Sequence, residues 1–408
     1  MHLTALNITD LIMGLFRGTL EVGPGDDIDT WDWAVLTGDT WKEHGAIVAS
    51  FKRHLSSSID RPPRDPSKKI NSGYKAVEFL NYVYGMLPAL LYGVLPEPYY
   101  GNFCKLVYGV RIICQRVITA DELREAHRAF TEFVVDFEEI YVQRDASRIH
   151  FVRQCIHNLI HLCPETIRVG PLSLLAQWLM ERTIGNLGEE IKQPSNPYKN
   201  LSERGLQRAQ TNAAISMLNL DPPPAPPKGS VELGDGYFLL NPTARSPMKM
   251  TDAEKKAFLL YARGKEPGYL VGDKGIRVIR KGRIRLPTQQ IGRTAWKEHQ
   301  KSSDAPLRIS RMVKDEEGNS QKDIFFGEVS YFFEAILNGE SEGLAMVSLC
   351  DNPNSEILGR SRTTLWVTRL IPGQHVRCIP ISVINSVVSL LPFPHIPGTL
   401  FLFEKSGP

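Results

Sequence analysis

The sequence predicts an α+β protein in which a mainly α-helical N-terminal domain precedes a small β-rich C-terminal domain, a barrel or a sandwich. Three observations lead to this prediction. Apolar residues recur at helical spacing before residue 143, a proline-rich segment follows at 221 to 230, and short β-prone runs alternate with turn signals after residue 323. At 408 residues the chain is long enough for two or three domains, each with its own core.

The first domain, residues 1 to 220, is expected to consist of helices. Helical spacing of apolar residues is clearest in three windows, at 74–95, 103–118 and 122–142. Thr119 and Glu122 form a capping box ahead of the last window. Residues 56 to 73 are rich in Ser and Pro, which predicts an exposed loop.

The segment DPPPAPPKGS, residues 221 to 230, is expected to be a linker because its prolines are incompatible with a helix. The β-rich domain then spans residues 231 to 408. Its strand-like runs are DIFFGEVSYFFEAI, GLAMVSLC, TTLWVTRL, HVRCIPISVINSVVSLL and TLFLFEK. Turn signals such as NGESEG, DNPNSE and PHIPG separate these runs, a pattern typical of an antiparallel sheet.

Composition places the chain among soluble globular proteins. It is 42% hydrophobic and 23% charged, with a formal net charge of +3. No apolar run approaches the roughly 18 residues that a transmembrane helix needs, and the first residues lack the basic region of a secretory signal. Six cysteines without a CxxC pair are typical of reduced thiols. We therefore expect an intracellular protein with no membrane partner.

The positive charge is concentrated in residues 272 to 311, which hold eleven Lys or Arg against three acidic residues. Within them, GIRVIRKGRIRLP predicts a strand or a hairpin turning at Gly282, with apolar residues on one face. The other face carries the candidate nucleic-acid contacts Arg277, Lys281, Arg283 and Arg285. A row of guanidinium groups can bind phosphates in a bidentate way, and Trp296 can stack on a base. The alternative is a solvated basic face without a ligand.

A second candidate lies in SRIHFVRQCIHNLIHLCPE. On one continuous helix its histidines would fall within about 40° of one another, beside Arg153. The resulting polar stripe consists of His150, Arg153, His157 and His161. We interpret it as structural, with a nucleic-acid-facing or active-site role as the alternative. A zinc site with Cys155 and Cys163 has less support, because both cysteines point away from the stripe.

Two acidic features complete the candidates. Glu181 lies on a segment that is apolar nearly all round, which predicts a buried helix. A buried carboxylate needs a partner, a metal or a water-filled cleft. The loop GPGDDIDTWDW, residues 23 to 33, holds four aspartates but lacks a glutamate at the spacing of a calcium loop, so a solvated turn is predicted.

Several stretches together resemble the CACTA-type (En/Spm) DNA transposases, especially their fungal copies. LLYGVLPEPYYGNFCKLVYGVRII, the histidine segment and QWLMERTIGNLGEEIKQPSNPYKNLSERG resemble the region that follows the nuclease core of these proteins. MHLTALNITDLIMGLFRGT resembles the end of the core itself. The resemblance covers residues 1 to 220 and continues more loosely through LAMVSLCDNP, TTLWVTRL and SVINSVVSLLP.

The resemblance implies a ribonuclease-H-like nuclease in which two aspartates and a glutamate hold two Mg²⁺ ions. Neither aspartate has a counterpart here, since the first would lie far upstream and the second just before Met1. Glu181 is the possible third carboxylate, with Glu189 and Glu190 as rivals. A two-metal site without two of its carboxylates should not retain Mg²⁺.

The chain is therefore expected to be the C-terminal part of a transposase, without a cofactor or nuclease activity of its own. What it retains is binding of DNA or of transposase subunits, in the nucleus, with no small-molecule substrate evident. One alternative is a subunit that completes the two-metal site in trans. Another is a structural protein-interaction module.

Overall fold

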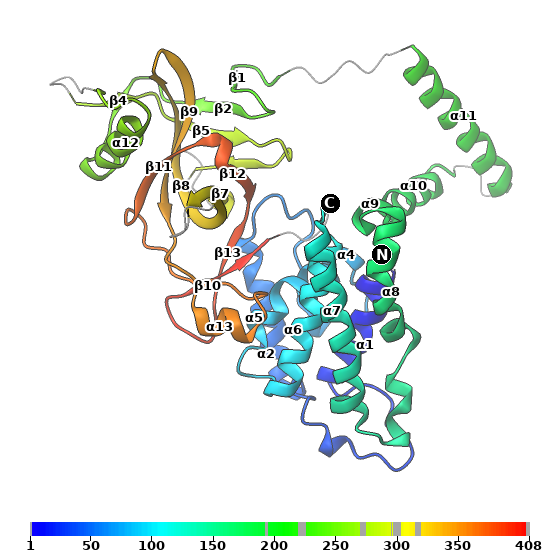
Figure 1. Ribbon diagram of the computed structural model, residues 1–408. Helices are drawn as coiled ribbons and strands as arrows, with labels where there is room; N and C mark the ends of the chain where they lie inside the picture. The colour runs from blue at the N-terminus through cyan, green and yellow to red at the C-terminus, as the bar shows by residue number, and fades with distance from the viewer. Residues whose placement is uncertain are drawn as a thin grey trace.

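The computed structural model describes residues 2–191, 195–218, 226–269, 275–294, 296, 303–314 and 320–404, with the side chains of 179, 311–314 and 320–322 left aside. Helices fill the N-terminal half and antiparallel sheets the C-terminal half (Figure 1). The predicted α+β class is confirmed. Residues 221 to 225 of the predicted linker lie outside the described residues.

The helical part is a bundle built around a few long helices. These are α1 (Ile8–Phe16), α2 (Gly38–Ser50), α6 (Glu97–Ile113), α7 (Ala120–Phe137) and α8 (Gln154–Val169). The shorter α3 (Pro66–Lys69), α4 (Ala76–Phe79) and α5 (Leu87–Leu90) lie between α2 and α6, and α9 (Leu172–Leu175) follows α8. The predicted capping box begins α7, since the Glu122 amide donates to Thr119 Oγ1 at 3.2 Å and the Glu122 carboxylate accepts from the Thr119 amide at 2.7 Å. The window 74–95 is helical but not uniform, because a π-helical segment, Leu80–Met86, joins α4 to α5.

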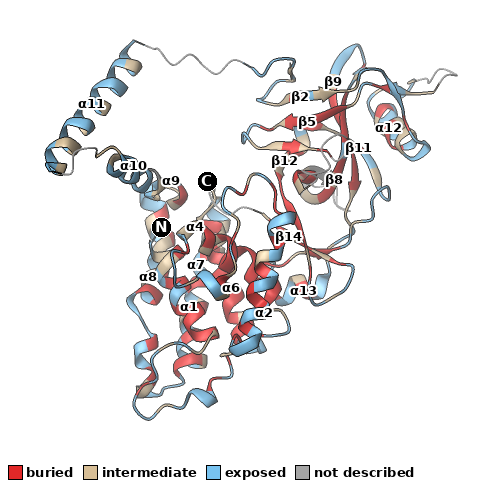
Figure 2. Cartoon of the chain, turned by 180° about the vertical axis from the view of Figure 1, so that it is seen from behind, coloured by how far each residue is buried: buried red, intermediate tan, exposed pale blue. Residues whose placement is uncertain are grey.

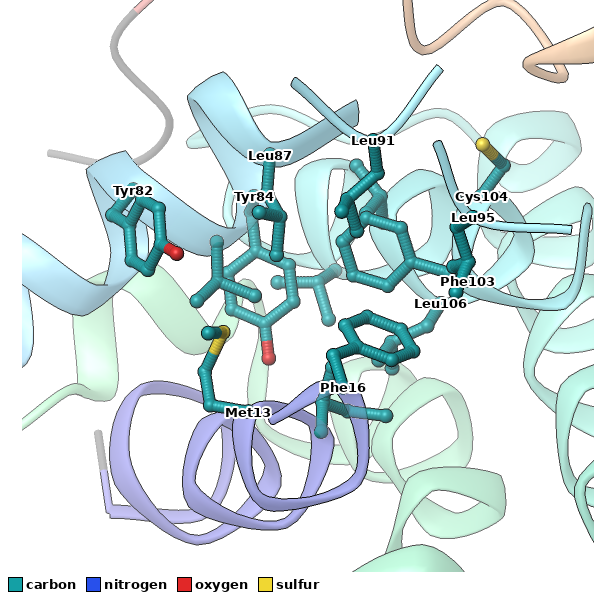
Figure 3. Close-up of a cluster of buried hydrophobic side chains, with 14 of the residues drawn as sticks. Met13, Phe16, Tyr82, Tyr84, Leu87, Leu91, Leu95, Phe103, Cys104 and Leu106 are labelled. Atoms are coloured by element: carbon teal, nitrogen blue, oxygen red, sulfur yellow. The ribbon is translucent and has the colours of Figure 1, made fainter. Parts of the chain in front are cut away.

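Large apolar side chains from three elements form the centre of this bundle. Figure 3 shows Met13 and Phe16 of α1 beneath Tyr84 of the π-helical segment and Phe103 of α6. The rings of Phe16 and Phe103 meet edge to face with centroids 5.5 Å apart. The Tyr84 hydroxyl donates to the Thr4 carbonyl at 2.7 Å, so its one polar atom is satisfied within the core.

The end of the chain completes the same core. Helix α13 (Ser355–Arg360) and a small sheet of β10 (Val367–Thr368), β13 (Ser389–Pro392) and β14 (Leu400–Phe403) pack on the bundle. Phe401 and Phe403 are almost fully buried there. Gly85 lies so close that a Cβ on it would stand 2.3 Å from the Phe403 ring. The division predicted after residue 230 therefore describes the large sheet but not the last strands, which return to the helices.

Nine strands of the described residues form the large sheet, in the order β1-β2-β5-β8-β7-β12, with β6 on β5, β9 on β8 and β11 on β9. The strands are β1 (Val231–Glu232), β2 (Phe238–Thr243), β5 (Lys281–Arg285), β6 (Ile291–Arg293), β7 (Pro306–Lys314), β8 (Ser320–Leu337), β9 (Glu340–Leu349), β11 (Val376–Pro380) and β12 (Ile384–Val387). The long β8 pairs with β7 along its first half and with β9 along its second. Before residue 323 the sequence indicated strand structure only at 275–287, so β1, β2, β6 and β7 are strands that it did not indicate.

An apolar core lies against each face of this sheet, although the second core covers only part of its face. One face encloses an apolar core that includes Leu239, Ile284 and Phe332. On the other, helix α12 (Asp252–Lys265) lies beside β11 (Figure 1). Its residues Phe258 and Ala262 are buried in a core with side chains of β8, β9 and β11. Next to α12, β3 (Met248–Lys249) and β4 (Arg277–Val278) form a separate two-stranded ribbon.

The helices α10 (Trp178–Glu189) and α11 (Pro197–Met217) extend away from the bundle, and pale-blue exposed residues dominate them in Figure 2. No residue described in either helix is buried. Met180 and Ile184 are each 57% exposed. The buried helix predicted around Glu181 is therefore wrong, because α10 contacts α11 and its described side chains, including Met180 and Ile184, remain exposed or half-buried.

A buried histidine gives the helical part a pH-dependent stability. His44 of α2 is 6% exposed, its Nε2 lies 2.7 Å from Tyr82 Oη, and burial lowers the pKa of His44 to about 4. Between the ordinary histidine pKa of 6.5 and this value, the unfolded chain binds a proton that the folded chain does not. Stability is therefore full above pH 6.5 and falls as the pH falls towards 4.

We expect that lowering the pH from 7.5 to 5.0 costs the wild type about 2 kcal/mol more than it costs His44→Phe. The phenylalanine keeps the ring volume and removes the titration. Urea unfolding of both proteins at the two pH values measures the difference. Parallel pH dependences of the two proteins would contradict the assignment to His44.

Candidate functional site

Strand β5 carries three of the predicted phosphate contacts on one face. Lys281, Arg283 and Arg285 alternate with Gly282 and Ile284, and Ile284 lies in the sheet core, so the alternation predicted for this strand is confirmed. The predicted turn at Gly282 is wrong, since this residue lies inside β5. A Cβ there would stand 2.8 Å from Cγ of Pro242, and this close approach is the reason for a glycine in the strand.

Arg277, the fourth predicted contact, lies in the β3–β4 ribbon instead of the large sheet. It is exposed and pairs directly across from Lys249, which is also exposed. Arg245 precedes the ribbon and is exposed as well. We call these three residues the basic ribbon. Like charges opposite each other in a sheet repel, so a bound anion would stabilise this pairing.

A second pair of like charges lies on β5 and β6. Arg283 is directly opposite Arg293, and Arg293 Nε lies 3.1 Å from the carboxylate of the buried Asp304. The other carboxylate oxygen of Asp304 accepts a hydrogen bond from the amide of Ser57 in the helical part. Burial lowers the pKa of Arg283, and repulsion from Arg293 lowers it further.

The other predicted contacts of this segment are less accessible. Lys281 is only 8% exposed and pairs with Phe332 of β8, so little of its side chain is available to a phosphate. The Arg285 guanidinium lies over the Phe238 ring at 4.1 Å and is half-buried. Trp296 is half-buried, and both of its neighbours in the chain lie outside the described residues.

The histidine stripe is divided between two elements. His150 lies in the 3₁₀ segment Ala146–Phe151, where its Nε2 is 2.7 Å from the Glu21 carbonyl oxygen. Arg153 precedes α8 and donates to Asp10 of α1 at 2.9 Å. His157 and His161 lie on α8 with their Nε2 atoms 3.0 Å apart, both exposed. The single continuous stripe predicted is wrong, because His150 lies in a separate 3₁₀ segment and α8 begins only at Gln154.

The possible third carboxylate, Glu181, is exposed on α10. Within the described ranges, no group of three or more His, Cys, Asp or Glu side chains is arranged to hold a metal ion. Of its two rivals, Glu190 forms an ion pair with Arg208 of α11. The described residues therefore give Glu181 no metal-binding partners.

An ion pair in the helical part was missed by the sequence interpretation. Asp26 of the aspartate-rich loop accepts from Arg148 Nε at 2.9 Å, and the two side chains are 1% and 6% exposed. Arg148 also donates to Gln143 and Thr30, at 2.7 and 2.8 Å. The predicted solvated turn is thus wrong for Asp26. The spacing between the two residues in the sequence carried no signal of this contact.

No family model matches the chain, and no curated protein or solved structure shows a significant similarity to it. Among the described residues, no helix combines the length and the apolar character needed to cross a membrane. The site must therefore be interpreted from its own chemistry.

Proposed function

We propose that this chain is a transposon-derived protein that binds DNA through the basic ribbon, in the nucleus and together with transposase subunits. The observation that carries the proposal is the charge around the ribbon. Residues 244 to 285 hold twelve Lys or Arg against four Asp or Glu, and the ribbon side chains Arg245, Lys249 and Arg277 are exposed. Phosphate contacts by Lys and Arg release counterions and supply most of non-specific DNA affinity.

The shape of the region supports the same proposal. A two-stranded ribbon is narrow enough to enter the major groove of DNA. Met248 and Ile279 at the ribbon are 36% and 48% exposed, so apolar side chains accompany the charges. Arg283 and Arg285 belong to the proposal as a second, half-buried set of contacts on β5.

The test is the salt dependence of DNA binding, measured by fluorescence anisotropy with a labelled duplex. Replacing Lys249 and Arg277 together with Gln is expected to reduce the slope of log K against log salt by about two, because each lost phosphate contact subtracts close to one. Replacing Arg283 and Arg285 together reports on the second set. If only the ribbon pair changes the slope, the contact surface is confined to the ribbon.

A matched control separates local contacts from net charge. Lys52 and Lys69 are exposed in the helical part, and replacing both with Gln removes the same two charges. We expect this control to bind DNA with the wild-type slope. Equal slopes for the ribbon variant and the wild type would exclude the ribbon from DNA contact.

The two alternatives differ in their support. The described residues give no support to strand transfer in trans, since Glu181 is exposed and has no metal-binding partners among them. A protein-interaction role is the second candidate, because α10 and α11 leave apolar side chains such as Met180, Tyr198 and Leu206 exposed. Failure to bind any duplex at low salt, together with stable self-association in light scattering, would favour this role.

A further inference from the structure

A cavity of about 510 Å³ lies at the junction of the helical and β-rich parts. Its lining comes mainly from α6, α7, β7, β8, β14 and the segment before β10, and includes Tyr108, Arg111, Arg308, Ile324, Phe326 and Trp366. Small-molecule sites typically measure about 300–1,000 Å³ and occur preferentially at such junctions. The size and the place of this cavity both suit a small ligand.

The charged lining has a surplus of cations. Three arginines (Arg111, Arg116 and Arg308) and two glutamates (Glu122 and Glu404) line the cavity. Both glutamates already accept hydrogen bonds, Glu404 from Arg308 at 2.9 Å and from Ser386 at 2.8 Å, and Glu122 from the capping residue of α7. Their charges are thus held by partners within the protein.

Arg111 has a different set of partners. Its guanidinium donates to the main-chain carbonyls of Tyr84 at 2.8 Å, Thr364 at 2.6 Å and Gly85 at 3.4 Å. Every hydrogen bond recorded for it in the described residues goes to a neutral acceptor. Arg111 is partly buried, and the carboxylate that acts on its charge, Glu404, is already hydrogen-bonded to Arg308 and Ser386. An anion bound beside Arg111 would stabilise its charge further.

Part of the cavity lining is apolar. The rings of Phe326 and Trp366 meet edge to face with centroids 5.2 Å apart, and Ile324 and Leu402 lie beside them. A smaller cavity is lined by the same four residues. This apolar part of the lining offers a surface for a planar, apolar group.

The backbone at the edge of the cavity is strained. Arg362 and Thr363 both have positive φ, 50° and 61°, and Thr363 lines the cavity. For a β-branched residue this conformation is rare. It is held on one side by the Arg362–Glu132 ion pair at 2.7 Å and on the other by the Thr364 carbonyl, which accepts from Arg111. Strain of this kind clusters at ligand-binding sites.

We propose that this junction cavity binds a small organic anion, with its carboxylate or phosphate at Arg111 and a planar apolar body against Trp366, Phe326 and Ile324. The inference rests on the helical–β junction and is independent of DNA binding at the ribbon.

The first test is calorimetric titration of the full chain with matched probes. Adenosine 5′-monophosphate and 1-naphthoate supply the phosphate and the carboxylate, and adenosine and 1-naphthylmethanol are their uncharged counterparts. At least one anion is expected to bind with one-to-one stoichiometry, and at least tenfold more tightly than its uncharged counterpart. The anion that binds shows whether the site recognises a phosphate or a carboxylate. Absence of binding by both anions at millimolar concentration overturns the proposal.

The second test blocks the cavity without touching Arg111, whose loss would also release three main-chain carbonyls. Ile324→Trp fills the cavity from β8 and is expected to weaken the anion at least tenfold. Ile336→Trp is the matched control, since Ile336 lies on the same strand, 70% exposed and outside the lining. Equal affinities of the two variants and the wild type would place the ligand elsewhere and overturn the assignment.

Discussion

Replacing Asp26 with Asn is expected to lower the free energy of unfolding by about 3–5 kcal/mol, as is usual when one partner of a buried ion pair is removed. The Asp26 carboxylate accepts hydrogen bonds from Arg148 and from the Trp31 indole at 3.0 Å. Asparagine can no longer neutralise the Arg148 guanidinium, which also lies 5.3 Å from the centre of the Trp33 ring. The buried cation would then be uncompensated.

The same replacement has a defined pH dependence. Burial would raise the pKa of Asp26, but hydrogen bonds from Arg148, the Asp27 amide and Trp31 hold it below its ordinary value. A lowered pKa means that the stabilisation is fully present above the ordinary carboxyl pKa and is lost as the pH falls through the lowered one. The difference between wild type and Asp26→Asn should therefore be full at pH 7 and shrink in acid.

Urea unfolding of both proteins at neutral and acid pH measures this difference. Asp29→Asn, in the same loop, is the control, because Asp29 is exposed. It should change the free energy of unfolding by less than about 0.5 kcal/mol. Similar losses for the two variants would show that the loop, and not the ion pair, is what asparagine disturbs.

The second large effect is expected at the other end of the chain. Phe401→Ala should cost about 3–5 kcal/mol, because it opens a cavity in the core that the helices share with β14. Phe401 is fully buried, and its ring lies 5.6 Å from that of Phe51 and 6.5 Å from that of Phe393. Although Phe401 belongs to a strand, its replacement should lower the temperature at which the helical circular dichroism signal is lost, relative to the wild type.

Thermal unfolding followed at 222 nm tests this, with Ile336→Ala as the control on the exposed end of β8. The control should melt as the wild type does. If Phe401→Ala left the helical transition unchanged, the last strands would not be part of the helical core.

Local features of this fold were predictable from the sequence. The capping box at Thr119 and Glu122 depends on residues three apart, and it forms as expected. Alternation over β5 likewise depends on neighbouring residues. The destination of Phe401 was not predictable, because a strand sequence does not specify which apolar surface it will cover. The same holds for Glu181, since an apolar helix is buried only where another layer covers it.

The candidate site was predictable in composition but not in arrangement. The cluster of basic residues in the sequence indicates where positive charge gathers. Whether a given side chain reaches solvent depends on pairing across strands, which brought Lys249 beside Arg277 and buried Lys281 next to Phe332. The junction cavity had no local signal, since Arg111 and Trp366 are brought together only by the return of the chain to the helices.

The return of the last strands to the helices also sets the order in which the helical core can form during synthesis. The helices leave the ribosome first, yet Phe401 and Phe403, which close their core, are among the last residues described. The growing chain therefore exposes apolar surface of the helical part, including Phe51, until the large sheet has been translated. Final packing of the helices is expected to be post-translational, and separate expression of the helical part should yield an aggregation-prone chain.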